Sequence, residues 1–293
     1  MEHIPSVDDL QRARPDLGQV EFVASGGFKA VFKATLRGRV EAVKIAYVPP
    51  DAEEDTSREE IVARVKREID TLRMCRTNRL VSLGSIDLQM ITIGGRDYLL
   101  YSEEFLTGET LRVRIRNGHR PDFEELVLLT RCLIEALDAI AQIGHIHRDV
   151  KPGNIVATGD PERPFVLLDL GIAYKIHGTE LTARGGPPGT LLYIAPELFR
   201  PDYKSALDIR SDVYSAGVTI FEYATGAHPL ARSGESEYTT VYRIVNQPPT
   251  KLATLRPDLP EVFCRLVDRC VKKFPALRYP NPRALLQELE EIE

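Results

Sequence analysis

Two kinds of hydrophobic periodicity divide the chain near residue 106. Before that point, short segments rich in β-branched and aromatic residues are separated by glycines and polar residues, which is typical of strands. We predict strands at residues 20–23, 30–35, 42–47, 83–88 and 97–101. One amphipathic helix is predicted among them at residues 58–75, because apolar residues recur there at helical spacing, namely Ile61, Val62, Val65, Ile69 and Leu72.

The second part of the chain has mostly helical spacing of its apolar residues. We predict helices at residues 123–143, 208–224, 241–246, 261–273 and 282–292. The two patterns together predict an α+β protein, with a small antiparallel sheet and one helix in residues 1–106 and a mainly helical part in residues 107–293.

Composition excludes several classes of protein. The chain has 293 residues, of which 43% are hydrophobic, so it can bury a large core. No apolar stretch is long enough to cross a membrane and the first residues lack the pattern of a secretory signal, so we expect a cytoplasmic protein. Four cysteines without a Cys-x-x-Cys pair favour free buried thiols. A net charge of -5 without a basic aromatic tract argues against a nucleic-acid partner.

The densest group of reactive side chains is the run HRDVKPGN at residues 147–154, which Asp169 follows. The run fits the pattern H-R-D-x-x-x-x-N, and with the later Asp-Leu-Gly it resembles the catalytic segment of protein kinases. The resemblance implies that Asp149 accepts the proton of the attacking hydroxyl. It also implies that Asn154 and Asp169 hold Mg²⁺, or Mn²⁺ in its place, on the phosphates of ATP.

A glycine-containing segment between the first two predicted strands resembles the phosphate-binding loop of the same family. Residues 24–31 read ASGGFKAV, in which Gly26 is a motif glycine and Gly27 an additional one. Ala24 and Lys29 stand where the family has its other two glycines. Taken alone, two adjacent glycines between strands also fit an ordinary turn.

The next strand carries a lysine in the context that the family requires. Ala42-Val43-Lys44 resembles the V-A-I-K strand, whose lysine contacts the α- and β-phosphates and pairs with a glutamate on the following helix. Here that glutamate would be Glu68. The nucleotide-binding residues implied by the resemblance are Ala24, Gly26, Gly27, Lys29, Val31, Ala42, Lys44, Glu104, Leu106 and Val156.

Two features beside the catalytic run resemble the Ser/Thr-specific branch of the family. Lys151, two residues after the expected base, resembles the lysine that Ser/Thr kinases keep beside the transferred phosphate. Gly189-Thr190 before Ala195-Pro196-Glu197 resembles their P+1 loop, in which Thr190 would bond toward Asp149 and Lys151. We therefore expect the acceptor to be a serine or threonine of a protein.

Residues 170–194 lack a clear period and are expected to form an activation segment. Thr179 and Thr182 are candidate phosphorylation sites, because a phosphate there could pair with Arg148. Autophosphorylation between two molecules would require a transient homodimer. The alternative is that both threonines are ordinary exposed loop residues.

The resemblance extends over about residues 20–290. Asp212 would hydrogen-bond the backbone of the catalytic loop, and Glu197 would pair with Arg278. Glu103 falls at the gatekeeper position behind the adenine pocket, where a buried acid needs a partner, or it lies in solvent if the alignment is one residue off.

Three functions remain open from sequence. The first is an active Ser/Thr protein kinase of the kind found in bacteria, with the bilobal kinase fold, ATP, Mg²⁺ and a protein substrate. The second is a nucleotide-binding pseudokinase, which the altered glycine loop favours and the complete catalytic set disfavours. The third is a small-molecule kinase, which the expected activation and P+1 segments disfavour.

Overall fold

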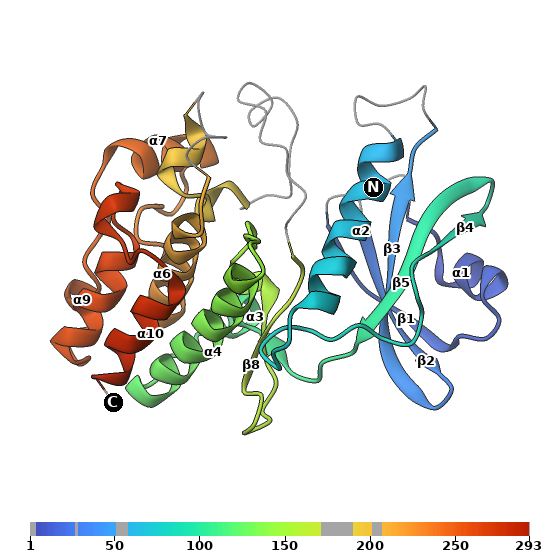
Figure 1. Ribbon diagram of the computed structural model, residues 1–293, viewed down its shortest axis with the longest axis horizontal. Coiled ribbons are helices and arrows are strands. Elements are labelled where there is room, and N and C mark those ends of the chain that lie inside the picture. Colours follow the sequence, from blue (N-terminus) through green and yellow to red (C-terminus); the bar gives the residue numbers. More distant parts are fainter. Residues whose placement is uncertain (1–3, 27–28, 51–57, 171–189, 201–206, 293) are drawn as a thin grey trace. The chain divides into compact units, whose positions relative to one another are not determined.

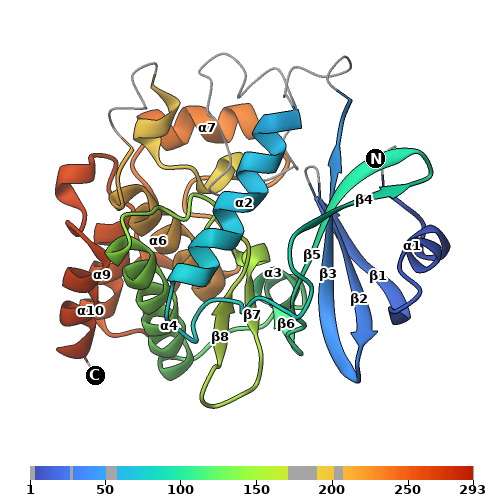
Figure 2. The same ribbon diagram turned by 45° about the vertical axis from the view of Figure 1, so that its right-hand side comes forward.

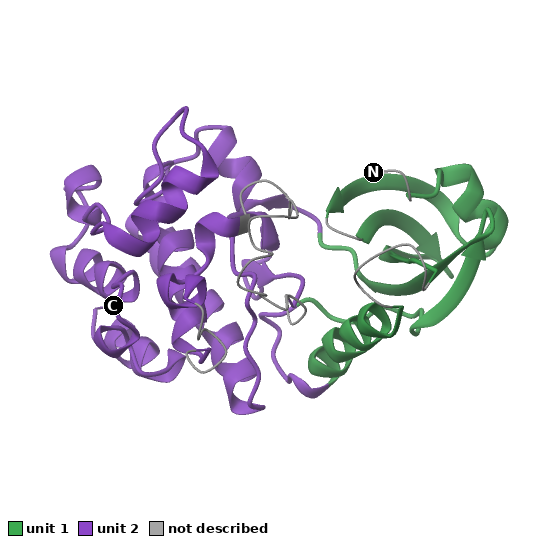
Figure 3. Cartoon of the chain, turned by 90° about the horizontal axis from the view of Figure 1, so that it is seen from above, with its two compact units in different colours: residues 1–73, 81–106 green, residues 74–80, 107–293 purple. Residues whose placement is uncertain are grey.

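The computed structural model describes residues 4–26, 29–50, 58–170, 190–200 and 207–292 (Figure 1). The chain separates into two compact units (Figure 3). Residues 1–73 and 81–106 form unit 1, and residues 74–80 and 107–293 form unit 2. None of the helices in the described part of the chain is long and apolar enough to span a membrane. All four cysteines are free, and three of them are buried.

Unit 1 is built on a five-stranded antiparallel sheet with the order β1-β2-β3-β5-β4. The strands are β1 (Gly18–Gly26), β2 (Lys29–Leu36), β3 (Arg39–Val48), β4 (Gln89–Ile93) and β5 (Arg96–Glu104). Alternating burial along β2 shows that its odd-numbered and even-numbered residues face opposite sides of the sheet. Six consecutive residues of β3, from Glu41 to Ala46, are buried, so the sheet buries residues on both of its faces.

Each face of the sheet is covered by a helix, α1 (Val7–Ala13) or α2 (Arg58–Met74) (Figure 2). On one face, Leu10 of α1 packs into a core with Phe32, Val43 and Leu100. Helix α1 was missed from sequence because seven residues are too few to show a helical period, although Ser6 caps its first turn. On the other face, the apolar side of α2 packs on Ala46, Val48, Leu99 and Tyr101.

The strand predicted at residues 83–88 is wrong. Those residues do not form a strand, although they meet β5 at an isolated bridge at Leu83 and through two backbone hydrogen bonds, from Gly84 N–H to the carbonyl of Ser102 at 2.8 Å and from Ser102 N–H to the carbonyl of Ile86 at 3.1 Å. The strand at this edge is β4, whose hairpin with β5 turns at Gly94 and Gly95. The carboxylate of Glu41 also holds this segment, because it accepts hydrogen bonds from the backbone N–H of Ser85 at 3.1 and 3.0 Å and from Ser102 Oγ at 2.6 Å.

Unit 2 is mainly helical, which together with the sheet of unit 1 confirms the α+β prediction. Its helices are α3 (Leu111–Arg116), α4 (Phe123–Gln142), α6 (Arg210–Thr225), α7 (Glu237–Asn246), α8 (Leu252–Leu255), α9 (Glu261–Cys270) and α10 (Pro282–Glu290). Fourteen consecutive residues of α6, from Ser211 to Ala224, are buried, so this helix forms the centre of the unit. Helix α7 begins four residues before the predicted start, because Ser236 caps its N-terminus.

A small sheet in unit 2 supports the catalytic run. It consists of β6 (Glu109–Thr110), β7 (Ile155–Ala157) and β8 (Phe165–Leu167), paired antiparallel. Residues 147–154 lie between α4 and β7 and end in the short 3-10 helix η1 (Pro152–Asn154). Asp169 follows β8. The hairpin of β7 and β8 thus brings the two ends of the sequence motif together within one unit.

Candidate active site

Asp212, in the first turn of α6, holds the backbone of the catalytic loop. Its carboxylate accepts hydrogen bonds from the backbone N–H groups of His147 at 2.6 Å and Arg148 at 2.8 Å. Arg148 has φ = 69°, a left-handed conformation that is costly for a side chain with a Cβ. Burial raises the pKa of Asp212, whereas its two hydrogen bonds favour the charged form. These contacts confirm the backbone role expected for Asp212.

His147 is buried and ties the catalytic loop to the end of β8. Its Nδ1 accepts a hydrogen bond from the backbone N–H of Asp149 at 3.2 Å, so Nε2 carries the proton and donates to the carbonyl of Leu168 at 3.1 Å. One imidazole thereby fixes the backbone of Asp149 relative to the strand that leads to Asp169. This is a structural role.

The carboxylate of Asp149 is held by two neighbours. Lys151 Nζ lies 2.8 Å from both of its oxygens, and Asn154 Nδ2 donates to Oδ2 at 2.8 Å and to the Asp149 carbonyl at 2.9 Å. The backbone N–H of Leu168 in turn bonds the carbonyl of Asn154 at 2.7 Å. The side chains of Asp149 and Lys151 remain 17% and 21% exposed, so the pair is accessible to a substrate.

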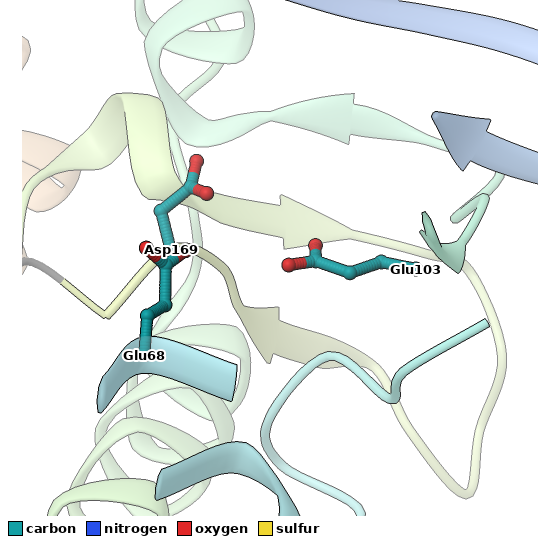
Figure 4. A group of neighbouring side chains, drawn as sticks. All are labelled: Glu68, Glu103 and Asp169. Carbon is teal, nitrogen blue, oxygen red and sulfur yellow. The ribbon is translucent and has the colours of Figure 1, made fainter. Parts of the chain in front are cut away.

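Asn154 and Asp169 offer oxygen atoms that suit a divalent cation. The Asn154 side chain donates two hydrogen bonds through Nδ2, so its amide oxygen can serve as a metal ligand. Asp169 is half-buried and has φ = 40°, and its carboxylate is drawn in Figure 4. Amide and carboxylate oxygens are the ligands that Mg²⁺ prefers, so the two residues fit such an ion.

The ion pairs of unit 1 correct the expected Lys44–Glu68 pair. Lys44 Nζ lies 2.6 Å from Glu103 Oε2, and Glu68 on α2 pairs instead with Lys29, the residue that replaces a motif glycine. Figure 4 shows the carboxylates of Glu68 and Glu103. Glu103 is buried, so the structure excludes the alternative in which it lies in solvent.

The other residues predicted to bind the nucleotide are distributed over both units. Ala24 and Gly26 are exposed on β1, and Val31 lies opposite Ala24 on β2. Ala42 is the cross-strand neighbour of Glu103. Three further residues complete the set, of which Glu104 accepts a hydrogen bond from Ser82 N at 2.8 Å, Leu106 is half-buried, and Val156 is buried on β7 of unit 2.

Four of the predicted site residues lie wholly or partly outside the described part of the chain. Gly27, Thr179 and Thr182 lie outside the described residues, and so does the side chain of Thr190, whose backbone begins the short helix η2 (Thr190–Tyr193). Arg148, the expected partner of a phosphothreonine, has an exposed side chain. The proposed switch therefore stays a prediction.

A buried ion pair anchors the segment around Glu197, which follows Ala195-Pro196. Arg278 donates to both carboxylate oxygens of Glu197 at 2.7 Å, and Ser211 Oγ donates to the same carboxylate at 3.1 Å. This confirms the pairing of Glu197 with Arg278.

Sequence reasoning missed a polar cluster around Glu222 of α6. Tyr193 donates to Glu222, which also pairs with Arg112 at 2.7 Å, and the ring of Tyr193 packs edge-on against His228. Only Glu222 within the apolar pattern of α6 hinted at this cluster, because a buried acid requires partners.

Comparison with known proteins places this geometry in a family. The sequence profile described as "Protein kinase domain" matches residues 18–289. A probable serine/threonine-protein kinase of Clostridium acetobutylicum is 27% identical over 93% of this chain and 39% of its own length. The serine/threonine-protein kinase PknA of Mycobacterium tuberculosis is 32% identical over 88% of this chain and 56% of its own length.

The fold also matches solved structures. The crystal structure of the Mycobacterium tuberculosis PknI kinase domain aligns with a TM-score of 0.64 and 22% identity, and the alignment covers 93% of this chain and 94% of that domain. The chain spans less than two thirds of the length of the curated relatives named above. With the catalytic loop, the fold and the profile in agreement, the chain belongs to the protein kinase domain family.

Proposed function

We propose that this chain is the catalytic domain of a Ser/Thr protein kinase that transfers the γ-phosphate of Mg-ATP to protein hydroxyls. The main support for this proposal is the position of the Asp149 carboxylate. Lys151 and Asn154 contact that carboxylate, and Asp212 fixes the backbone of the loop that carries it. Membership of the protein kinase family supports the use of ATP and a divalent metal.

The chemistry at Asp149 is proton transfer. As the hydroxyl oxygen of the substrate forms its bond to the γ-phosphorus, the bond from that phosphorus to the bridging oxygen of ADP breaks, and Asp149 accepts the hydroxyl proton. Lys151, 2.8 Å from both carboxylate oxygens, orients Asp149 and places a positive charge where the transferred phosphoryl group arrives.

Asn154 and Asp169 would hold the metal, and Lys44 would contact the nucleotide phosphates. A bound Mg²⁺ would neutralise charge on the phosphate oxygens. Two observations support Ser/Thr as the acceptor: Lys151 lies beside Asp149, and the bacterial relatives are named serine/threonine-protein kinases. The substrate is therefore proposed to be a protein.

Two observations favour a second candidate, a domain that binds nucleotide without transferring phosphate. Lys44 is engaged by Glu103, and a lysine stands at a glycine position of the phosphate-binding hairpin. Both changes lie in unit 1 and leave Asp149, Asn154 and Asp169 present. If the domain is inactive, weak binding of the nucleotide phosphates is therefore the expected cause.

We also propose that activity rises when Thr179 or Thr182 is phosphorylated, in a transient homodimer. The exposed Arg148 supplies a guanidinium that a phosphate can engage bidentately. Mass mapping of active protein should find phosphate in residues 170–194, and active protein without phosphate there would contradict the proposal.

The function is tested by offering several acceptors with radiolabelled Mg-ATP. We expect label on serine or threonine of a generic basic protein or of the chain itself, and none on a tyrosine-only polymer or on small alcohols. Label confined to small alcohols would indicate a small-molecule kinase. Nucleotide binding without label on any acceptor would favour the binding domain.

A further inference from the structure

Two lysines and two glutamates form one polar group on the α2 side of the sheet in unit 1. Lys44 Nζ lies 2.6 Å from Glu103 Oε2, and Lys29 pairs with Glu68. The hydroxyl of Tyr101 contacts both members of the Lys29–Glu68 pair, because it donates to Glu68 Oε1 at 3.1 Å and accepts from Lys29 Nζ at 3.3 Å. The two ammonium groups lie 5.8 and 5.9 Å from the centre of the tyrosine ring.

The strand register explains why these side chains meet. Lys44 is directly opposite Tyr101, and Glu103 is two residues further along β5, so Glu103 lies on the same face and diagonal to Lys44. Lys29 is two residues from Val31, which is the cross-strand neighbour of Lys44 on β2. Lys29 therefore projects from the glycine-containing hairpin onto the face that α2 covers.

The charges of the group balance. A buried ammonium is costly unless a carboxylate accompanies it, and one carboxylate compensates one lysine. Glu68 alone could accompany either Lys29 or Lys44. The second acid, Glu103, forms an ion pair with Lys44, so Glu68 can form its ion pair with Lys29. Lys29 and Glu103, two departures from the family pattern, thus compensate each other in charge.

The two lysines differ in access. The side chain of Lys29 is 16% exposed and that of Lys44 is 4% exposed. Lys29 also begins β2 directly opposite Gly26, at which a Cβ would meet no atom within 4 Å. An oriented, partly exposed ammonium beside open backbone is suited to a phosphate oxygen.

We infer that Lys29 is a second phosphate-binding lysine, positioned by Glu68 and Tyr101, and that Glu103 takes over the positioning of Lys44. The inference rests on the proposed function, because it assigns a further residue to the same nucleotide. It predicts recognition of the polyphosphate, with no contribution from Lys29 to binding of the nucleoside.

The first test compares Mg-ATP with adenosine as ligands of Lys29→Met. We expect the affinity for Mg-ATP to fall about tenfold and that for adenosine to change less than about twofold. Lys33→Met is the matched control, because Lys33 lies on the same face of β2, is 37% exposed and pairs only loosely, at 3.7 Å, with Glu21. It should leave both affinities unchanged.

Three results would overturn the assignment. If Lys29→Met weakens both ligands equally, the lysine supports the fold and does not bind phosphate. If it weakens neither ligand while wild type binds Mg-ATP, Lys29 contributes nothing to the site although the proposed function stands. If wild type binds no Mg-ATP, the proposed function fails and the phosphate-binding role fails with it.

A second test examines the pairing itself and needs no nucleotide. Double-mutant cycles on urea unfolding should show coupling of about fivefold or more in the unfolding constant for Lys29→Met with Glu68→Gln and for Lys44→Met with Glu103→Gln. The crossed combination of Lys44→Met with Glu68→Gln should be additive within about twofold. The inference would be overturned if Lys44→Met and Glu68→Gln were strongly coupled while the Lys29–Glu68 and Lys44–Glu103 combinations were additive. That result would show that Lys44 pairs with Glu68 after all.

Discussion

Asp212 acts on the catalytic base through two backbone N–H groups, those of His147 and Arg148. We predict that Asp212→Asn lowers kcat by about 100-fold, because the amide can accept only one of these bonds well and small displacements of a reacting group are costly. The affinity for Mg-ATP should change less than about threefold. Steady-state kinetics with nucleotide-binding measurements would check both expectations.

Asp208→Asn is the control for that variant. Asp208 also lies at the start of α6, where its carboxylate accepts hydrogen bonds from the side chain and the backbone N–H of Arg210. Within the described residues, its side chain makes no hydrogen bond to the catalytic loop at residues 147–154. This variant should keep kcat within about twofold of wild type. Equal losses in both variants would mean that α6 matters only for stability.

His228 predicts an acid-sensitive contribution to stability. Burial lowers its pKa, and the neutral ring accepts at Nδ1 from the N–H groups of Leu230 and Ala231 while Nε2 donates to the carbonyl of Leu192. The unfolded histidine, with its ordinary pKa of about 6.5, takes up a proton before the folded one does. The stabilisation is therefore fully present above that value and is lost as the pH falls below it.

The comparison with His228→Gln isolates this effect. Between about pH 7.5 and about pH 5.5, the unfolding free energy of wild type should fall more steeply than that of the variant, which cannot titrate in this range. Denaturant unfolding at several pH values measures the difference. Parallel profiles would show that His228 titrates alike in the folded and unfolded chain.

Residues of the catalytic run were predictable from sequence, and side-chain pairings were predictable only in part. The spacing of Asp149 and Asn154 is local, so the motif already determines their contact. The pairing of Lys44 depends on strand register and on which other charges share the same face. Lys29 and Glu103 were noticed as departures from the family pattern, but their effect on Glu68 required the structure.

At the scale of elements, α6 and α9 pack closely at Gly217. A Cβ at this position would lie 2.5 Å from the Cβ of Cys270 and 3.0 Å from Cγ1 of Val271. We predict that Gly217→Ala lowers the unfolding free energy by about 1–2 kcal/mol, because overpacking outweighs the gain of about 1 kcal/mol in helix propensity. Urea denaturation measures the change.

Gly153→Ala is the matched substitution for that test. A Cβ on Gly153 would meet no atom within 4 Å, so the unfolding free energy should stay within about 0.5 kcal/mol of wild type or rise slightly. If Gly217→Ala is as stable as Gly153→Ala, the two helices can separate at no cost and the packing account is wrong.

Long periodic elements were predicted from sequence better than short or irregular ones. Helix α4 ends within one residue of its prediction, because 20 residues show the helical period clearly. The prediction of a strand at residues 83–88 was wrong. In sequence, an apolar run that forms a regular strand has the same pattern as one that is held partly by a side chain. Here the backbone N–H of Ser85 donates to the carboxylate of Glu41, while Gly84 and Ile86 on either side bond the backbone of Ser102.

At the scale of the whole molecule, sequence motifs from both units led to one family, and the profile match to residues 18–289 agrees. The change of periodicity near residue 106 coincides with the residue at which unit 1 ends. The assignment of residues 74–80 to unit 2 was not foreseen, because the contacts that place them there are distant in sequence: Arg79 pairs with Glu135 at 2.7 Å and binds the carbonyl of Glu162.

The central claim is that Asp149 of this chain serves phosphoryl transfer from Mg-ATP to a protein hydroxyl. The most direct test measures single-turnover transfer of radiolabelled phosphate by wild type, Asp149→Asn and Asp160→Asn, with the Mg-ATP affinity of each determined in parallel. Asp160 is an exposed loop acid of the same unit and serves as the control.

We predict that Asp149→Asn lowers the transfer rate about 100-fold or more while its Mg-ATP affinity stays within about threefold of wild type. Asp160→Asn should match wild type in both measurements. Full transfer by Asp149→Asn, or bound nucleotide with no transfer by wild type, would contradict the account.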